Sequence, residues 1–142
     1  MKTRWKLILA LAATGLWLWF IYARSAATGE ASHNESSAIL ELLRSYLPFV
    51  TTAMVRKGAH IFEFFILGSL LYLDWRLLGR GPVLLPLGAG LLFAAADELL
   101  QTFVPARSGE VLDVLIDFCG VAAGVGLGLL LRRRKEAKAR GE

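Results

Sequence analysis

Four apolar runs constrain this chain more than any other feature of its sequence. They cover residues 7–23, 59–73, 83–104 and 111–131, and basic or turn-forming residues bound them. A helix that crosses a bilayer needs about 20 mostly apolar residues, with a range of about 17 to 25. The third and fourth runs reach this length and the first just reaches it. The second run reaches it only if the polar residues 55–58 that precede it belong to the same helix.

The composition also indicates a membrane protein. Hydrophobic residues make up 56% of the 142 residues, and the mean hydropathy is +0.54. Soluble domains are roughly 45–50% apolar, and a short soluble chain has too little interior to bury more. We therefore predict an all-α bundle of about four transmembrane helices in one domain, residues 1–142. The helices are expected near residues 7–23, 57–74, 83–104 and 110–131.

Basic residues indicate which side of the membrane each end of the bundle faces. If the N-terminus lies inside, five Lys and Arg residues lie outside: Arg24, Arg44, Arg56, Lys57 and Arg107. The inner side then holds eleven: Lys2, Arg4, Lys6, Arg76, Arg80 and the six from Arg132 to Arg140. An excess of Lys and Arg marks the cytoplasmic side. We predict a multi-pass protein of the cytoplasmic (inner) membrane with both termini inside. The basic residues behind the net charge of +4 anchor helices in this interpretation, so we do not expect nucleic-acid binding.

Two segments allow alternative interpretations. Residues 7–23 follow a basic stretch and precede small residues, as in a cleaved signal peptide, but the run is long and ends in an aromatic group, which favours an uncleaved helix. The outer segment, residues 24–56, contains apolar residues at helical spacing between Ile39 and Leu47. These residues predict a short amphipathic helix, either lying on the membrane face or packed on the bundle. At the C-terminus, residues 132–142 are predicted to be a solvated basic tail.

The ionisable residues of the last three predicted membrane helices gather in their outer halves. The helix at 57–74 begins with Lys57, His60 and Glu63, which are spaced three apart. The other outer polar residues are Asp97, Glu98 and Gln101, then Arg107 in the next loop, then Asp113 and Asp117. The inner halves of these helices are almost wholly apolar. The sequence therefore predicts a polar cluster that faces outward at one end of the bundle.

Carboxylates at membrane depth need a partner. An Asp at the centre of a spanning helix costs about 2.5–3.5 kcal/mol on insertion scales. The five acids of the cluster must therefore share protons, pair with the cations, line a wet cavity or bind a metal ion. Asp97, Glu98, Asp113 and Asp117 are the candidate metal ligands, and oxygen donors favour Ca²⁺ or Mg²⁺. The alternative is a buried hydrogen-bond network that only holds the helices together.

Glycines on the last helix provide a simpler means of packing. Gly120, Gly124 and Gly128 recur every fourth residue and form two overlapping GxxxG motifs, which permit close approach of a neighbouring helix. The same four-residue step leads outward to Asp117 and Asp113. The motif could pack this helix within the chain, or it could pair two copies in a homodimer.

The polar residues also carry a resemblance to a known family. Lys57-x-x-His60-x-x-Glu63-Phe64 resembles the first signature of the VanZ-like membrane proteins. The segment from Asp97 to Arg107, with Glu98, Gln101, Phe103 and Pro105 between them, resembles the second signature. Asp113, Asp117, Gly120 and Gly124 follow at the expected intervals, although the family usually has Asn at the position of Asp117. The resemblance covers about residues 55–130.

The resemblance implies a cell-envelope function in a bacterium. The family is named for a member linked to resistance against the glycopeptide antibiotic teicoplanin. The arrangement is more distantly similar to membrane enzymes that act on lipid head groups, such as phosphatidylserine synthases. One hypothesis is therefore an enzyme that acts on lipid head groups or lipid-linked cell-wall intermediates at the outer leaflet.

In this enzyme hypothesis the cluster supplies two kinds of group. Candidate catalytic residues are His60, Glu63, Asp97, Glu98 and Asp113, and candidate substrate-binding residues are Lys57, Gln101, Arg107 and Asp117. The second hypothesis is a protein that binds an anionic lipid or cell-wall precursor without chemistry and so limits antibiotic access. The third is an ion or proton pathway, which the apolar inner halves of the helices disfavour.

Overall fold

The computed structural model describes residues 2–27, 29–43, 46–79 and 81–141. Within these ranges the chain forms helices and no strands, so the predicted all-α class is confirmed. The described helices are α1 (Lys2–Ser25), α2 (Gly29–Leu43), α3 (Thr52–Leu78), α4 (Leu84–Gln101) and α5 (Val111–Arg140). Arg44 and Arg80, which entered the charge count, lie outside the described residues.

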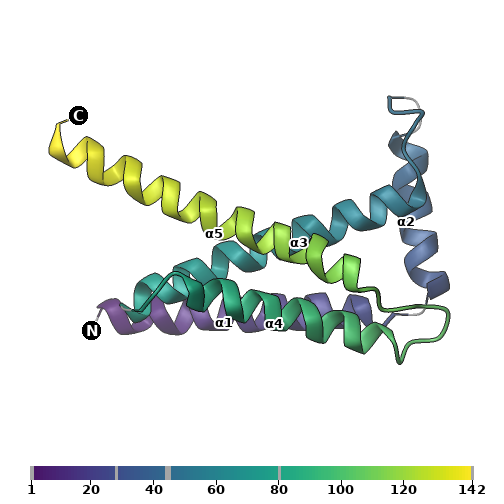
Figure 1. Ribbon diagram of the computed structural model, residues 1–142, viewed down its shortest axis with the longest axis horizontal. Helices are drawn as coiled ribbons and strands as arrows, with labels where there is room; N and C mark the ends of the chain where they lie inside the picture. The colour runs from purple at the N-terminus through teal and green to yellow at the C-terminus, as the bar shows by residue number, and fades with distance from the viewer. Residues whose placement is uncertain (1, 28, 44–45, 80, 142) are drawn as a thin grey trace.

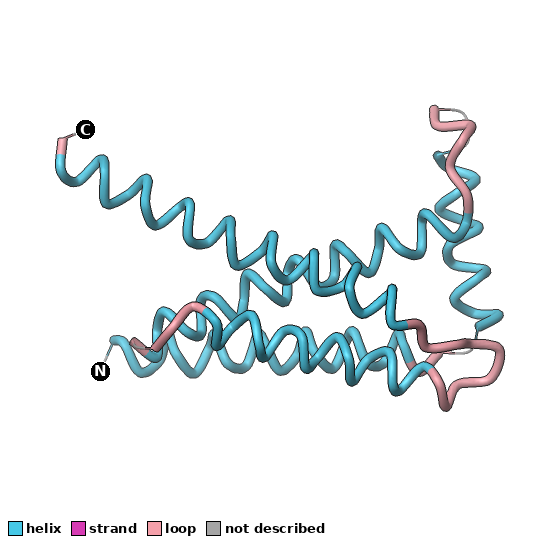
Figure 2. Tube along the Cα trace, viewed as in Figure 1, coloured by secondary structure: helices cyan, strands magenta, loops and turns pink. Residues whose placement is uncertain are grey.

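Four of the helices run lengthwise and the fifth lies across one end (Figure 1). α1, α3, α4 and α5 form the bundle, and α2 stands nearly perpendicular to them. The loop of residues 102–110, between α4 and α5, lies at this same end, which we call the α2 end (Figure 2). Both chain termini and the turn between α3 and α4 lie at the opposite end, which we call the terminal end.

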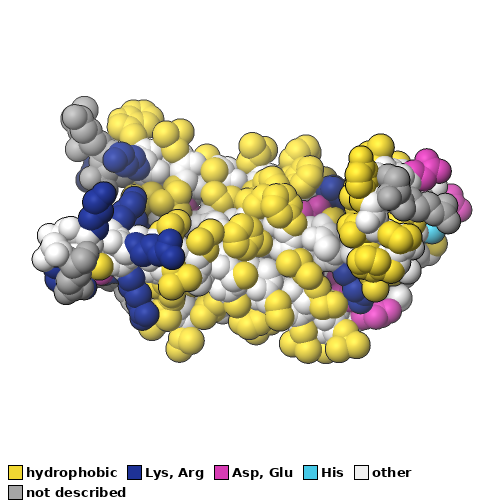
Figure 3. Space-filling model, turned by 90° about the horizontal axis from the view of Figure 1, so that it is seen from above, with side chains coloured by type: hydrophobic (Ala, Val, Ile, Leu, Met, Phe, Trp, Pro, Cys, Tyr) yellow, Lys and Arg dark blue, Asp and Glu magenta, His cyan; other side chains and the backbone are white. Residues whose placement is uncertain are grey.

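Three helices are long and apolar enough to cross a membrane: Arg4–Ser25, Leu84–Gln101 and Val111–Arg140. α3 is longer than α1 and α4, but Glu63 and Asp74 lower the hydropathy of its apolar stretch. α3 nonetheless packs against all four other helices and shares its most extensive contact with α5. The predicted count of about four spans therefore depends on this more polar central helix. A broad band of hydrophobic side chains covers the bundle between its two charged ends (Figure 3).

Helix boundaries differ from those predicted, because hydropathy detects only the apolar part of a helix. α3 begins at Thr52, where the Thr51 hydroxyl accepts a hydrogen bond from the Met54 amide at 3.3 Å, a common N-cap. It ends at Gly79, which has a φ of 91° and closes the helix in the left-handed region. The predicted solvated tail, residues 132–142, is mostly exposed in its described part, and α5 remains helical through it to Arg140.

The amphipathic helix in the first connection is present, with different limits. α2 spans Gly29–Leu43, so it begins ten residues before Ile39 and ends before Tyr46 and Leu47. Its first half is rich in Ser, Asn and Glu, which resembles a loop in composition. Ser36 is buried against the bundle and Leu42 is exposed, so α2 packs across the end of the bundle with its polar side inward.

Glycines bring α3 and α5 into backbone contact. A Cβ added at Gly120 would meet the carbonyl oxygen of Ile61, and one added at Gly124 would meet the backbone of Phe65 and Ser69. The GxxxG face of α5 therefore packs on α3 of the same chain. Fully buried apolar side chains fill the space around this contact, namely Ile21, Phe64, Leu67, Ala94, Val121 and Val125.

Candidate functional site

Polar side chains from α1, α3, α4 and α5 meet inside the α2 end of the bundle. The buried members are Ser25, Glu63, Asp97, Glu98, Gln101 and Asp117, and His60 is half-buried among them. Asp97 and Asp117 have no exposed surface at all. The structure thus brings together most of the residues that the sequence singled out, although they come from helices far apart in the chain.

Hydrogen bonds fix the carboxylates of α4. One oxygen of Asp97 accepts hydrogen bonds from the Ser25 hydroxyl at 2.8 Å and from the Gln101 amide at 2.9 Å. The same amide donates to Glu98 at 3.1 Å. Gln101 lies three and four residues after these acids, so its side chain returns along the same helix face. Gln101, predicted to bind substrate, therefore positions two carboxylates of its own helix.

The N-terminus of α5 supports two further carboxylates. Glu98 accepts a hydrogen bond from the backbone amide of Glu110 at 3.0 Å, directly at the start of α5. Asp113 lies in the first turn of the same helix and forms an ion pair with Lys57. The first turn of a helix carries partial positive charge, which favours anions at both positions. Lys57 and Asp113 thus satisfy each other at the edge of the cluster.

Four ionisable side chains lie at the centre of the site. We call His60, Asp97, Glu98 and Asp117 the His–acid group, because each can offer one nitrogen or oxygen atom such that all four atoms lie within 4.8 Å of one another. His60 Nδ1 lies 3.4 Å from Asp117 Oδ1 without hydrogen-bond geometry. Among the described residues, neither oxygen of Asp117 and only one oxygen of Asp97 has a hydrogen-bond donor. Three members of the predicted metal-ligand set are present, and His60 takes the place of Asp113.

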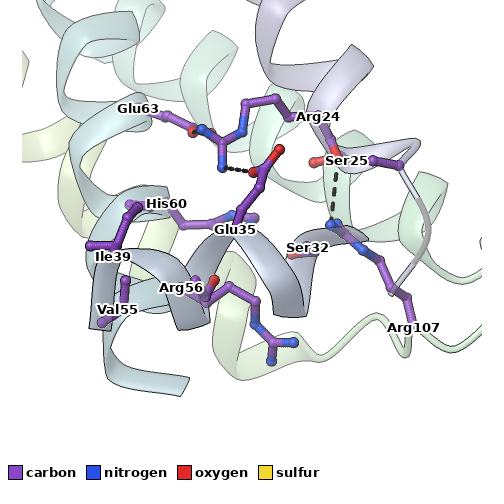
Figure 4. Close-up of a pocket in the computed structure, with 13 residues that line it drawn as sticks. Arg24, Ser25, Ser32, Glu35, Ile39, Val55, Arg56, His60, Glu63 and Arg107 are labelled. Carbon is purple, nitrogen blue, oxygen red and sulfur yellow. Dashed lines mark hydrogen bonds and ion pairs between the residues drawn. The ribbon is translucent and has the colours of Figure 1, made fainter. Parts of the chain in front are cut away.

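Arginines surround the mouth of the site. The Arg24 guanidinium lies between Glu63 of α3, at 3.2 Å, and Glu35 of α2, at 3.0 Å (Figure 4). Arg107 donates to the carbonyl oxygen of Arg24 at 3.4 Å. Burial lowers the pKa of Arg107 from its ordinary value, although a guanidinium stays protonated in proteins. With the exposed Arg56, these residues form a basic rim of three arginines: Arg24, Arg56 and Arg107.

A small cavity separates the basic rim from α2. Its volume is about 30 Å³, and Ser32, Glu35 and Ile39 of α2 line one side of it, while His60 and Glu63 of α3 line another. A water molecule needs about 10–15 Å³ of such space, so the cavity has room for two or three waters and not for a lipid head group. α2 is therefore the element that limits access to the His–acid group.

Sequence reasoning missed four residues of the site: Arg24, Ser25, Glu35 and Arg56. Arg24 and Ser25 end the first apolar run, at the same membrane level as the outer ends of the other helices. That shared level is the signal that could have placed them in the cluster, because the outer ends of spanning helices meet at the same membrane surface. Glu35 has no comparable signal, since its contact depends on how α2 lies across the bundle.

A separate buried carboxylate lies toward the terminal end. Asp74 of α3 is 6% exposed, and it accepts a hydrogen bond from the Thr14 hydroxyl of α1 at 2.6 Å. The expectation that the inner helix halves are almost wholly apolar is therefore wrong at this position. α3 continues past Asp74 to Leu78, which carries the carboxylate into the bundle instead of leaving it at the helix end.

Comparison with known proteins identifies the family. The family model described as VanZ/LLP1 matches residues 10–132, which include every residue of the His–acid group. The chain belongs to the VanZ/LLP1 family. The resemblance inferred from the two signatures is thereby confirmed.

One relative agrees with a membrane location. The "Uncharacterized membrane protein YwnJ" of Bacillus subtilis (strain 168) is 38% identical over 87 residues, which are 61% of this chain and 58% of that protein. The matched region thus spans less than two thirds of the relative's length. No solved structure matches the chain. With three apolar helices long enough to span a bilayer, this VanZ/LLP1 family member is a membrane protein.

Proposed function

We propose that this protein binds the phosphate-bearing head group of a lipid or lipid-linked cell-wall intermediate at the outer leaflet, and performs chemistry on it at the His–acid group. One observation carries the proposal: a buried His–acid group lies beneath a basic rim at one end of a membrane bundle. Head-group phosphates lie at this level of a bilayer, and arginine binds them through two parallel hydrogen bonds.

The proposed orientation places the α2 end outside the inner membrane and the terminal end in the cytoplasm. The charge bias of the sequence supports it, since eleven of the sixteen Lys and Arg residues belong to the terminal end by this assignment. Figure 3 shows Lys and Arg side chains gathered at that end, beyond the hydrophobic band. The family's association with a cell-wall antibiotic agrees with an outward-facing site.

The residues divide into two proposed roles. Arg107 and Arg56 hold the phosphate, because among the described residues neither forms an ion pair with a carboxylate. His60 transfers protons to or from the reacting group, and Asp117 orients its imidazole from 3.4 Å. Arg24 is engaged by Glu63 and Glu35, so it positions α2 over the site until a substrate phosphate competes for it.

A non-catalytic binder is the second candidate. Among the described residues, no serine hydroxyl or cysteine thiol forms a hydrogen bond with His60, and the Ser25 hydroxyl donates to Asp97. Catalysis would therefore require water or a substrate hydroxyl as the nucleophile. A protein that held a cell-wall precursor through the same rim would limit antibiotic access without changing the bound molecule.

Mass spectrometry of purified protein incubated with phospholipids and lipid-linked precursors separates the two candidates. His60→Ala and Asp117→Asn are the test variants. Glu136→Gln is the matched control, because Glu136 lies exposed on α5 at the terminal end, far from the site, where it pairs with Arg132. We expect a new product with the wild type and the control and none with the two variants. Retention of an unchanged lipid by all four proteins would replace the catalytic proposal with the binding one.

A further inference from the structure

The centre of the His–acid group holds more buried carboxyl groups than there are cations paired with them. Asp97, Glu98 and Asp117 are between 0 and 4% exposed. The described ion pairs of Arg24 go to Glu35 and Glu63, and that of Lys57 goes to Asp113, so neither cation pairs with these three acids. His60 is the one cationic partner within ion-pair distance, and it reaches only Asp117 among the described residues.

Unpaired lone pairs point to a missing ligand. Asp117 is fully buried on α5, and both of its carboxylate oxygens lack a hydrogen-bond donor in the described structure, as does the second oxygen of Asp97. An unsatisfied buried polar group costs about 1–3 kcal/mol, and more when it is charged. Three such oxygens lie in one place beside His60 Nδ1, which is 3.4 Å from Asp117 Oδ1, and a neutral imidazole at this position adds a fourth electron-pair donor.

We propose that His60, Asp97, Glu98 and Asp117 bind one divalent transition cation, for which Mn²⁺ is the probe. The inference rests on the proposed function for the role of the site, whereas cation binding itself is measured without any lipid. The four donor atoms lie within 4.8 Å of one another. Ligand atoms bonded at about 2.1 Å lie about 3.0 to 4.2 Å apart around one octahedral ion, so the four side chains must draw closer together to close the site.

The donor set selects the class of cation. Ca²⁺ takes six to eight oxygen ligands, and a site with an imidazole nitrogen does not meet that requirement. Imidazole suits first-row transition metals, and carboxylates suit Mn²⁺ among them. The substitution of His60 for Asp113 in the ligand set thus moves the expected ion from Ca²⁺ or Mg²⁺ toward Mn²⁺ or Zn²⁺. Gln101 and the Glu110 amide donate hydrogen bonds to two of the acids, as outer partners of metal ligands do.

Electron paramagnetic resonance of Mn²⁺ tests the proposal on the full chain in detergent micelles. Free Mn²⁺ gives a six-line signal that weakens on binding, and a coordinated imidazole adds a nitrogen coupling. We expect one Mn²⁺ per chain, displaceable by Zn²⁺. Asp117→Asn and His60→Gln should each weaken binding at least about 100-fold, since loss of an outer partner alone costs 10–100-fold. His60→Gln should also abolish the nitrogen coupling.

Asp113→Asn is the matched control, because Asp113 lies one helical turn from Asp117 on α5 but pairs with Lys57. It should change Mn²⁺ affinity by less than about threefold, because its charge lies beside the site and is already paired with Lys57. Circular dichroism and size-exclusion chromatography establish that each variant is folded, and Glu98→Gln replaces any variant that is not.

Three outcomes overturn the inference. The first is that the wild-type protein binds neither Mn²⁺ nor Zn²⁺ at millimolar concentration. In that case shared protons or a protonated His60 stabilise the buried carboxyl groups, and no metal ion does. An equal loss of Mn²⁺ affinity in Asp113→Asn and Asp117→Asn assigns the ion to another ligand set. Unchanged Mn²⁺ affinity in His60→Gln excludes the imidazole as a ligand. A protein that binds lipid but no cation leaves the proposed function intact and removes this inference, whereas one that binds cation but no lipid does the reverse.

Discussion

Gly124→Ala should destabilise the bundle, whereas Gly126→Ala on the same helix should not. A Cβ at Gly124 would lie 2.7 Å from the Ser69 amide nitrogen and 3.0 Å from the Gly68 carbonyl carbon, and both are backbone atoms of α3. Ordinary contacts of a Cβ begin near 3.4 Å, so α3 and α5 must separate by at least about 0.7 Å. A gap of 0.5–1 Å forfeits about a quarter to a half of the dispersion attraction at each contact.

The expected cost follows from overpacking of a tight contact, which is typically about 1–3 kcal/mol. Both substitutions gain the same helix propensity, and nothing lies within 4 Å of a Cβ at Gly126. The difference between the two variants therefore isolates the α3–α5 contact. Titration with sodium dodecyl sulfate in mixed micelles, followed by tryptophan fluorescence, measures it as a shift of the unfolding midpoint.

Equal midpoints for the two variants would refute this reasoning, because they would show that α3 does not approach Gly124 closely. A gain in stability for Gly124→Ala would refute it more strongly. A change in oligomeric state with Gly124→Ala alone would indicate instead that this face meets a second copy of the chain. Size-exclusion chromatography of both variants distinguishes that case from packing within one chain.

Two further predictions concern the two ends of the bundle. Thr14→Val removes the hydroxyl that donates to buried Asp74 and should lower stability by about 1–2 kcal/mol in the same titration, and an unchanged midpoint would show that water replaces the bond. Glu35→Gln breaks the exposed ion pair that ties α2 to α1, which is worth about 1 kcal/mol or less. The assay uses Ser36→Cys in a chain whose native cysteine is replaced by serine. In this background Glu35→Gln should make the new thiol react with an impermeant maleimide about two- to fivefold faster. An unchanged rate would show that other contacts hold α2.

The sequence predicted which segments form helices better than where they end. Hydropathy located the apolar stretches because a lipid-facing helix must be apolar over its length. It could not locate the ends, because Thr51 and Gly79 terminate α3 through a cap and a backbone conformation that lie outside the apolar stretch. It also missed the first half of α2, whose polar residues are satisfied by the polar end of the bundle.

The spacing of Lys57, His60 and Glu63 illustrates what periodicity leaves undetermined. A step of three residues rotates about 60° less than a full helical turn. The two steps from Lys57 to Glu63 therefore rotate the side-chain direction by about 120° in total along α3. In the structure each finds a different neighbour: Lys57 reaches Asp113, His60 reaches Asp117, and Glu63 reaches α1. The relative register of the helices decides such pairings, and a single sequence contains no direct record of it.

The glycine contact and the His–acid group depend on each other. Gly120 lies three residues after Asp117 and allows the α5 backbone to approach Ile61, the residue that follows His60. This close approach is what places the two side chains 3.4 Å apart. Three buried carboxylates cost about 8–10 kcal/mol on insertion scales, which is comparable with the whole stability of a typical domain at about 5–15 kcal/mol. A bundle that keeps such a group therefore needs tight packing below it and a positive partner within it.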